Sequence, residues 1–273
     1  MRNILGVVAL AFGISALVPF AVAQAPDQQG NQQQAPQAAP PPSQQAPLPP
    51  NPAPAPAGPV IVLDPAHGGT DSGARGQNGA AEKDLALWMA RGVRSELLRE
   101  GFRVVMTRND DSNPSYDDRA ALANGYRDAT FISLHIASTG TVGSFRVYYD
   151  RLSTPDVSSA EAASATGKIV LPAASTLNSW NDAQRAYVNS SHSLADLIQI
   201  ELAQKFSGSA DASLGAAVRG LRSVAGPAVA IELSSVSAPD PNALATSAAA
   251  PLGEAIGRAL TAFRASNPGG AKQ

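Results

Sequence analysis

The stretch Pro59-Val60-Ile61-Val62-Leu63-Asp64-Pro65-Ala66-His67-Gly68-Gly69 begins as a continuous apolar run and ends in a glycine-rich turn that carries a histidine. A run that is apolar at successive positions, rather than at alternate ones, is typical of a strand buried on both faces of a sheet. We therefore expect a buried strand from Pro59 to Asp64, with His67 projecting beyond its carboxyl end.

The chain that follows alternates between helical and strand patterns. From Glu82 to Glu100 apolar residues recur at helical spacing, and Gly101 is well placed to end that helix; the stripe consists of Leu85, Trp88, Met89, Val93 and Leu97. Strands are predicted at 102–107, 130–136, 145–149 and 227–233, and helices at 115–126, 193–206 and 241–263, the last kinked or split by Pro251. This alternation predicts an α/β fold, a three-layer sandwich.

Residues 1–23 have the features of an export signal. Arg2 precedes an apolar run from Ile4 to Val18, Pro19 interrupts it, and Ala21-Val22-Ala23 forms a small-x-small cleavage pattern. The run approaches membrane-spanning length, so an uncleaved anchor is the alternative. Pro19 and the cleavage pattern favour removal, which would leave no stable membrane span and an exported protein, periplasmic or secreted.

Residues 24–58 consist almost entirely of Gln, Pro and Ala and hold 11 of the 22 prolines, so we expect a disordered linker. The folded domain is predicted to run from 59 to 265, followed by a disordered tail at 266–273. Within the domain, residues 150–190 are rich in Ser and Ala and weakly periodic. A loop of that length is usually functional or disordered.

The composition excludes several kinds of chemistry. The 273 residues include no cysteine, so disulfides and thiolate sites are excluded and any metal must bind nitrogen and oxygen ligands. A formal net charge of -2 gives no electrostatic reason to expect nucleic acid as a partner. No nucleotide-binding glycine loop and no HExxH helix is present in the sequence.

Four residues are candidates for a catalytic site. His67 and His135 each follow or end a predicted strand, where ligands gather in open α/β sheets, and Glu82 begins the first long helix. A His/Glu/His set with an open fourth position is typical of catalytic zinc. Taken singly, a strand-end histidine is more often a satisfied polar residue, and Glu82 is explained by the helix dipole. Glu232 lies within a buried strand, where a carboxylate is costly unless it is paired or catalytic. His192 is interpreted as a surface or capping residue.

The order of six short segments gives these candidates a common context. They are Ile61 to Gly69, Glu82-Lys83-Asp84-Leu85, Thr107-Arg108, Arg119 to Asn124, Ser133-Leu134-His135 and Ile231-Glu232-Leu233. In this order they resemble the zinc-dependent N-acetylmuramoyl-L-alanine amidases of bacterial cell-wall remodelling. The resemblance extends from about Val60 to Phe263.

The resemblance implies a mixed, mostly parallel sheet flanked by helices. It also implies Zn²⁺ held by His67, Glu82 and His135, with Glu232 as the catalytic acid–base. The substrate implied is peptidoglycan, at the amide between N-acetylmuramic acid and the L-alanine of the stem peptide. Asp64 and Ser133 are candidates for orienting a histidine ring.

Two features of the resemblance leave alternatives open. Arg219 would either meet a stem-peptide carboxylate or be a solvated surface residue. The 150–190 segment falls where some family members insert a helix that blocks the zinc site until a protein activator binds, and a flexible insertion is the alternative. Rival functions are a non-catalytic peptidoglycan-binding module with the same fold and a zinc peptidase acting within the stem peptide.

Overall fold

The computed structural model describes residues 59–76, 78–151 and 180–267. The predicted signal (1–23), the linker (24–58), the end of the tail (268–273) and residues 152–179 of the predicted insertion lie outside the described residues. The described helices are not long and apolar enough to cross a membrane.

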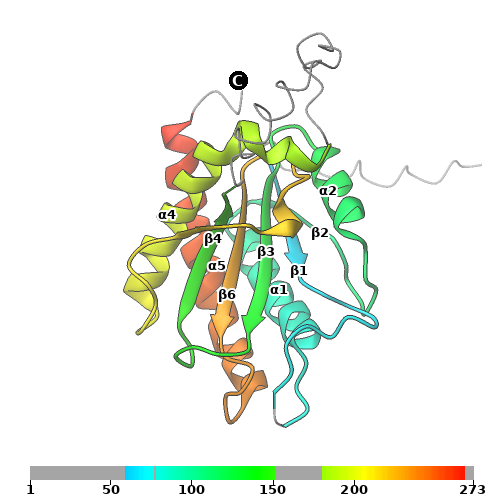
Figure 1. The fold of residues 1–273 in the computed structure, drawn as a ribbon. Coiled ribbons are helices and arrows are strands. Elements are labelled where there is room, and N and C mark those ends of the chain that lie inside the picture. The colour runs from blue at the N-terminus through cyan, green and yellow to red at the C-terminus, as the bar shows by residue number, and fades with distance from the viewer. Residues whose placement is uncertain (1–58, 77, 152–179, 268–273) are drawn as a thin grey trace, which may run out of the picture. The chain divides into compact units, whose positions relative to one another are not determined.

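Six strands form one sheet in the order β2-β1-β3-β6-β4-β5 (Figure 1). Their bounds are β1 (Val60–Pro65), β2 (Arg103–Met106), β3 (Thr130–Ala137), β4 (Phe145–Asp150), β5 (Leu214–Ala216) and β6 (Ala228–Ser234). The first four strands in that order are parallel, whereas β4 runs antiparallel to β6. The prediction of a mixed, mostly parallel sheet is confirmed.

Helices cover both faces of this sheet, as the three-layer prediction requires. The α-helices are α1 (Glu82–Arg99), α2 (Tyr116–Asn124), α4 (Val188–Lys205) and α5 (Pro241–Ser266), and the 3-10 helices are η1 (Trp180–Tyr187) and η2 (Arg219–Leu221). Ile61 and Leu63 of β1 pack into one apolar core with α1, α4 and α5. The alternate positions Val60 and Val62 pack with α2 and η2 on the other face.

The α2 face is covered incompletely. Its apolar core includes Val62 of β1, Phe131 of β3 and Ala230 of β6, all of which lie before the carboxyl ends of their strands. α2 has nine residues and η2 has three, so together they cover much less sheet than the three long helices opposite. Among residues 59–76, 78–151 and 180–267, no helix covers the carboxyl ends of the strands on this face, and polar residues occupy them.

The first and last helices each differ from the sequence prediction at one residue. Trp88, predicted in the buried stripe of α1, is 55% exposed, and its indole nitrogen donates to the Thr246 hydroxyl. Leu85, Met89, Val93 and Leu97 already form the apolar face, so Trp88 lies beside it.

Pro251 does not split α5, which runs as one helix from Pro241 to Ser266. A proline within a helix costs about 3 kcal/mol, but Leu252, Ala255 and Ile256 beside it are fully buried and hold the helix in place. Because α5 ends at Ser266, the first residue of the predicted tail belongs to this helix.

The chain before α4 is also more ordered than predicted. Residues 180–187, assigned to the weakly periodic insertion, form η1, and α4 begins at Val188 rather than near Ser193. The buried Gln184 side chain of η1 donates to the carbonyl oxygens of Val224 and Gly226 at 2.8 and 2.9 Å, which anchors η1 to the sheet side of the fold.

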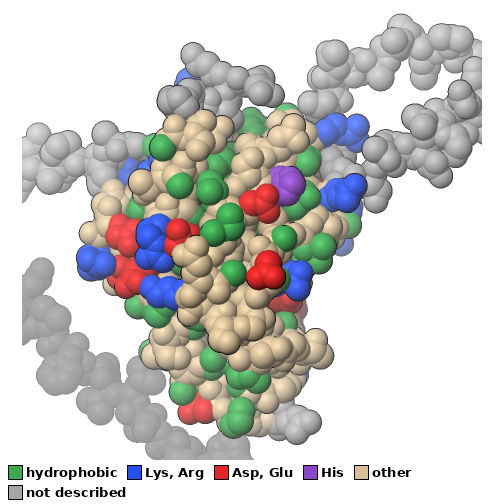
Figure 2. All heavy atoms as spheres, turned by 90° about the vertical axis from the view of Figure 1, so that its left-hand side faces the viewer, with side chains coloured by type: hydrophobic (Ala, Val, Ile, Leu, Met, Phe, Trp, Pro, Cys, Tyr) green, Lys and Arg blue, Asp and Glu red, His purple; other side chains and the backbone are tan. Residues whose placement is uncertain are grey.

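The outer surface over α4 and α5 carries charges of both signs (Figure 2). Ion pairs join the two helices, Lys205 with Glu254 and Arg258 with Glu201. His192 lies within α4, half exposed, where its ring stacks on Tyr149 and pairs with Asp196, so its interpretation as a surface residue is confirmed.

Candidate metal centre

Strand pairing places polar side chains in two adjacent rows on the α2 face of the sheet. The first row consists of four residues, each paired in register with the next across the sheet: Asp64, Ser133, Ala230 and Tyr148. Those of the second row, one pleat further along, are His135, Glu232 and Arg146. Residues two positions apart on a strand share a face, so both rows face the same cleft.

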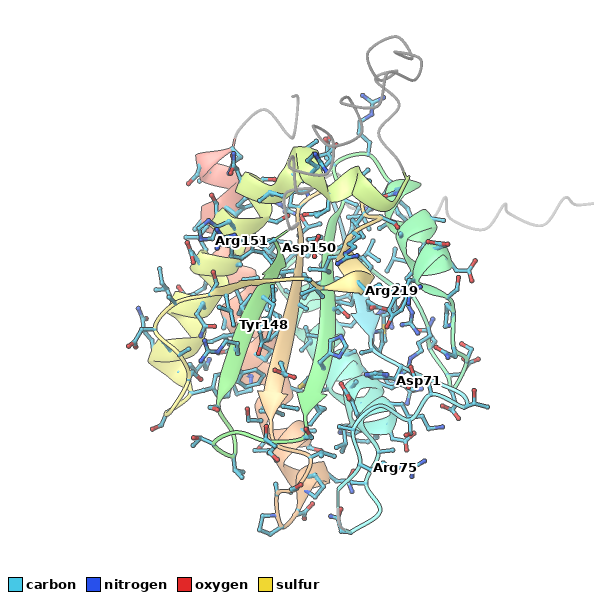
Figure 3. All side chains as sticks on the ribbon, viewed as in Figure 1. Asp71, Arg75, Tyr148, Asp150, Arg151 and Arg219 are labelled. Atoms are coloured by element: carbon cyan, nitrogen blue, oxygen red, sulfur yellow. The ribbon has the colours of Figure 1, made fainter. Side chains whose placement is uncertain are left out.

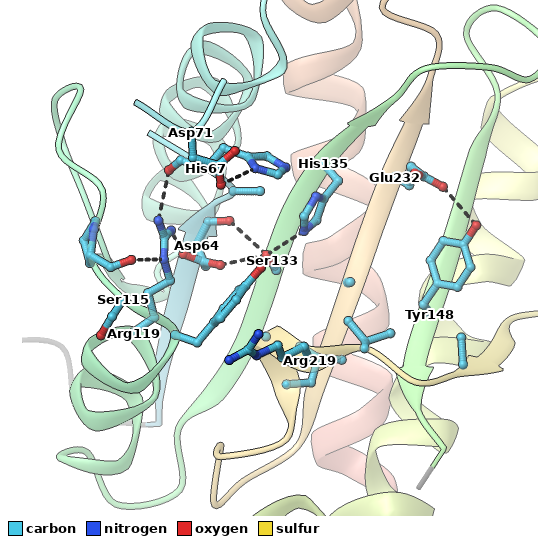
Figure 4. A pocket seen from close by; sticks show the side chains of 18 of the residues that line it. Asp64, His67, Asp71, Ser115, Arg119, Ser133, His135, Tyr148, Arg219 and Glu232 are labelled. Atoms are coloured by element: carbon cyan, nitrogen blue, oxygen red, sulfur yellow. Dashed lines mark hydrogen bonds and ion pairs between the residues drawn. The ribbon is translucent and has the colours of Figure 1, made fainter. Parts of the chain in front are cut away.

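That cleft has a volume of about 500 Å³. Its floor includes Ser133, His135 and Glu232, Tyr148 closes one side, and Arg219 stands at the rim (Figure 4). Tyr116 also lines the cleft. Figure 3 shows Tyr148 on β4, Arg219 in front of the sheet and Asp71 beside the start of α1. A cleft at the carboxyl ends of parallel strands is where α/β proteins bind ligands.

Three of the predicted site residues converge at one end of the cleft. His67, Glu82 and His135 each offer a ligand atom, and these atoms all lie within 4.8 Å of one another. The buried Glu82 carboxylate lies between the rings, with Oε2 3.2 Å from His67 Nε2 and Oε1 2.9 Å from His135 Nδ1. Glu82 occupies the first turn of α1, and its Oε1 accepts a hydrogen bond of 3.0 Å from the backbone nitrogen of Ile136, near the carboxyl end of β3.

The remaining nitrogen of each histidine has a partner that orients its ring. Asp71 Oδ2 lies 2.8 Å from His67 Nδ1, and Ser133 Oγ lies 3.3 Å from His135 Nε2. The expected contact of Ser133 with a histidine is confirmed. Asp64 contacts the His135 ring only through Ser133, because Asp64 Oδ2 accepts a hydrogen bond from the Ser133 hydroxyl at 2.7 Å. Each ring thus presents its other nitrogen to Glu82, as in metal sites where outer partners orient the ligands.

Asp71 was not predicted from the sequence. It contacts His67 because Gly68 and Asp71 exchange two backbone hydrogen bonds of 2.9 Å, which folds the chain back on itself. The sequence feature that could have indicated Asp71 is a carboxylate four residues after a histidine in a glycine-rich turn.

Two buried arginines hold the turn that carries His67. Arg119 donates to the carbonyl oxygens of Pro65 at 3.0 Å and His67 at 2.9 Å, and Arg108 donates to those of Pro65 and Ala66, both at 2.9 Å. His67 has a φ of +62°, a region that side chains rarely occupy. These four bonds fix three successive carbonyls and therefore hold His67 in that conformation.

The donor set fits a divalent zinc ion. Two imidazoles and a carboxylate are the ligands of many catalytic zinc sites, which keep a fourth position open. Burial alone would raise the pKa of Glu82, but hydrogen bonds with His135 and His67 outweigh it and hold that pKa well below its usual range. Glu82 is therefore ionised, as a metal ligand must be.

We predict that zinc binding to the metal-free protein releases a proton from His67. The Glu82 hydrogen bond, against the opposing effect of burial and with help from Asp71, raises the pKa of His67 from 6.5 to about 9. His67 therefore stabilises the metal-free fold fully below about pH 6.5, and this contribution is lost as the pH rises through about 9. Zinc must displace that proton at neutral pH, so its affinity should rise with pH across this window.

Calorimetry at pH 7.5 in buffers of different ionisation enthalpy measures the released protons. The observed binding enthalpy should change with the buffer by an amount that corresponds to nearly one proton. The same enthalpy in every buffer would contradict the prediction.

The other predicted residues line the same cleft. Glu232, half buried on β6, accepts a hydrogen bond from the Tyr148 hydroxyl at 2.9 Å. Arg219 is exposed and its guanidinium carbon lies 5.4 Å from the centre of the Tyr116 ring. Glu232 is the register partner of His135, and Glu232 and the two histidines of the cluster line the same cleft.

Comparison with known proteins gives this site a context. The family model described as N-acetylmuramoyl-L-alanine amidase matches residues 61–262, which include all the site residues and every strand except the first residue of β1. The chain belongs to the N-acetylmuramoyl-L-alanine amidase family.

Curated members of this amidase family match short segments of the chain. N-acetylmuramoyl-L-alanine amidase AmiA of Escherichia coli is 42% identical over 76 residues, 28% of this chain and 26% of that protein. AmiC of Escherichia coli is 47% identical over 77 residues, 28% of this chain and 18% of that protein. The matched segments thus span about a quarter or less of the length of these two relatives.

Solved amidase structures share the fold over most of the chain. N-acetylmuramoyl-L-alanine amidase AmiC2 of Nostoc punctiforme has a TM-score of 0.54 at 24% identity, covering 75% of this chain and 96% of that one. The CwlD amidase from Clostridioides difficile, solved in complex with the GerS lipoprotein, has a TM-score of 0.55 at 18% identity and covers 77% and 100%. These likenesses support the α/β sandwich.

Proposed function

We propose that this amidase-family domain hydrolyses the amide between N-acetylmuramic acid and the L-alanine of the peptidoglycan stem peptide. The observation that carries the proposal is the His67–Glu82–His135 cluster, whose two histidines line the same cleft as Glu232. The family match over residues 61–262 supplies the substrate class.

In this proposal His67, Glu82 and His135 hold a zinc ion. A zinc ion held there would supply Lewis acidity, which would polarise the amide carbonyl and make water easier to deprotonate. Asp71 and Ser133 hold the two rings with their other nitrogens towards Glu82.

Glu232 is the proposed acid–base. Its carboxylate lies on the floor of the cleft, in the same row as His135, within a strand whose other residues are apolar or small. Glu232 takes a proton from the attacking water and passes it to the nitrogen of the leaving alanine. A carboxylate suits both steps because it accepts and returns one proton.

Arg219 is proposed to bind a carboxylate of the stem peptide. It stands at the rim of the cleft over Tyr116, and within the described residues no carboxylate pairs with it. We predict that Arg219→Met raises KM about tenfold and changes kcat little, the size expected for losing one charge-assisted hydrogen bond. Steady-state kinetics on muropeptides measures this effect. On substrates whose carboxylates are amidated the variant and wild type should be equal, and an equal loss on both substrates would contradict the role.

Export and regulation belong to the same proposal. The features of residues 1–23 favour export to the periplasm, where peptidoglycan lies. Control of the site by residues 150–190 and a protein activator stays a prediction, and deletion of residues 155–180 should then raise activity on purified sacculi.

Digestion of purified peptidoglycan by the zinc-loaded chain tests the function. Mass spectrometry should find free stem tripeptides or tetrapeptides together with glycan that has lost its peptides. Products cut within the stem peptide would instead identify a zinc peptidase. Binding to the wall without release of peptides, even with excess zinc, would identify a binding module.

A further inference from the structure

The Tyr148 hydroxyl lies 2.9 Å from Glu232 Oε2 inside the cleft (Figure 4). We infer that Tyr148 is a positioning residue, which donates this hydrogen bond to hold the Glu232 carboxylate in the orientation that its acid–base role requires. The inference rests on the proposed function, since it gives Glu232 the part described there.

The contact follows from the antiparallel pairing of β4 with β6. The register partner of Tyr148 is Ala230, which lies two residues before Glu232 on the same face of β6. Aromatic side chains reach the diagonal neighbour across a strand pair, and the small Ala230 side chain leaves that path open. The phenol therefore crosses above Ala230 and ends at the carboxylate.

Glu232 needs such a contact because little else holds its carboxylate. Arg146 and His135 are its register partners, yet neither forms a hydrogen bond or ion pair with it in the described parts of the chain. Within those residues the Tyr148 hydroxyl is its one recorded hydrogen-bond donor. The bond occupies Oε2 and leaves Oε1 to exchange a proton with water and the leaving amine.

The hydroxyl remains a donor throughout the neutral pH range. Burial and the hydrogen bond to Glu232 together raise the pKa of Tyr148 to about 12. Tyr148 thus keeps its proton while Glu232 gains and loses one, so the two groups have separate parts in the reaction.

Kinetics of Tyr148→Phe, Glu232→Gln and the double variant test the inference on the zinc-loaded chain. Tyr148→Phe keeps the ring and should lower kcat roughly tenfold, with KM within about twofold and unchanged zinc content. In the Glu232→Gln background the same change should have no further effect, because its action passes through the carboxylate. The matched control is Tyr149→Phe, which changes the next residue of β4. The Tyr149 ring stacks on His192, and this variant should behave as wild type.

Two kinetic outcomes would overturn the inference. One is a Tyr148→Phe variant with wild-type kcat. The other is an equal loss with and without the Glu232 carboxylate, which would mean that Tyr148 acts on the fold or the substrate.

A titration separates failure of this inference from failure of the proposed function. Glu232→Gln should lower the pKa of Tyr148 from about 12 by the part that the carboxylate contributes, while the larger effect of burial remains; tyrosinate absorbance follows the titration, with Tyr148→Phe as the reference. If this shift occurs in a protein that releases no stem peptide, the pairing stands and the amidase proposal fails. If the titration is unchanged, the pairing itself is refuted.

Discussion

Glu232→Gln is expected to lower the rate of stem-peptide release about a thousandfold while zinc binding stays at the wild-type level. Gln has nearly the size and shape of Glu, so the packing of β6 is preserved. What is lost is the group that takes the proton from water and returns it to the amine. The loss should appear in kcat, because the carboxylate acts on the reacting atoms.

Release of stem peptides, measured by mass spectrometry beside the zinc content of each sample, checks this expectation. Glu254→Gln is the matched control and should retain full activity, since Glu254 lies on α5, does not line the cleft, and pairs with Lys205 of α4. If Glu232→Gln kept more than about a tenth of the wild-type rate, Glu232 would not be the acid–base.

Gly73→Ala is expected to weaken zinc binding by roughly a hundredfold, the upper range for changes beside a metal ligand. A Cβ at Gly73 would lie 2.5 Å from Glu82 Oε2 and 2.6 Å from His67 Cδ2, so it must displace one of the proposed ligands. Activity should fall with the zinc content and should recover in part when zinc is added in excess. Competition with a chromophoric chelator measures the affinity.

The neighbouring Gly79 gives the control for backbone strain. Gly73 and Gly79 both have positive φ, +61° and +85°, but a Cβ at Gly79 would meet nothing within 4 Å. Gly79→Ala should therefore cost about 1 kcal/mol of stability and leave zinc affinity within about twofold. Equal loss of zinc in both variants would show that loop strain, and not the contact with the ligands, is responsible.

The sequence was sufficient for the parts of the fold whose residues repeat with a period. The apolar run from Val60 to Leu63 and the helical stripe after Glu82 each predicted an element within one or two residues of its observed bounds. The three-residue strand β5 was missed because it is too short for any alternation to show. Trp88 was misplaced because helical spacing does not distinguish the centre of an apolar face from its edge.

The candidate site, like the fold, could be predicted from the sequence only in part. His67, Glu82 and His135 stood out because their residue types and their places at strand or helix ends indicated a metal site. Asp71 depends on a tight backbone turn, and Tyr148 depends on which residue of β6 faces it across the sheet. Register between strands distant in sequence is set by tertiary packing, so local pattern gave no means of finding this pair.

The arginine contacts around the His67 turn have a consequence for metal exchange. Acid does not remove the charge of a guanidinium group, and peptide carbonyls do not titrate, so mild acid that releases a bound ion should leave these bonds to Pro65, Ala66 and His67 intact. The metal-free site should therefore keep the backbone conformation of the His67 turn. Refilling would then be limited by the arrival of a new ion rather than by rebuilding of the loop, and other divalent ions could be substituted without unfolding the protein.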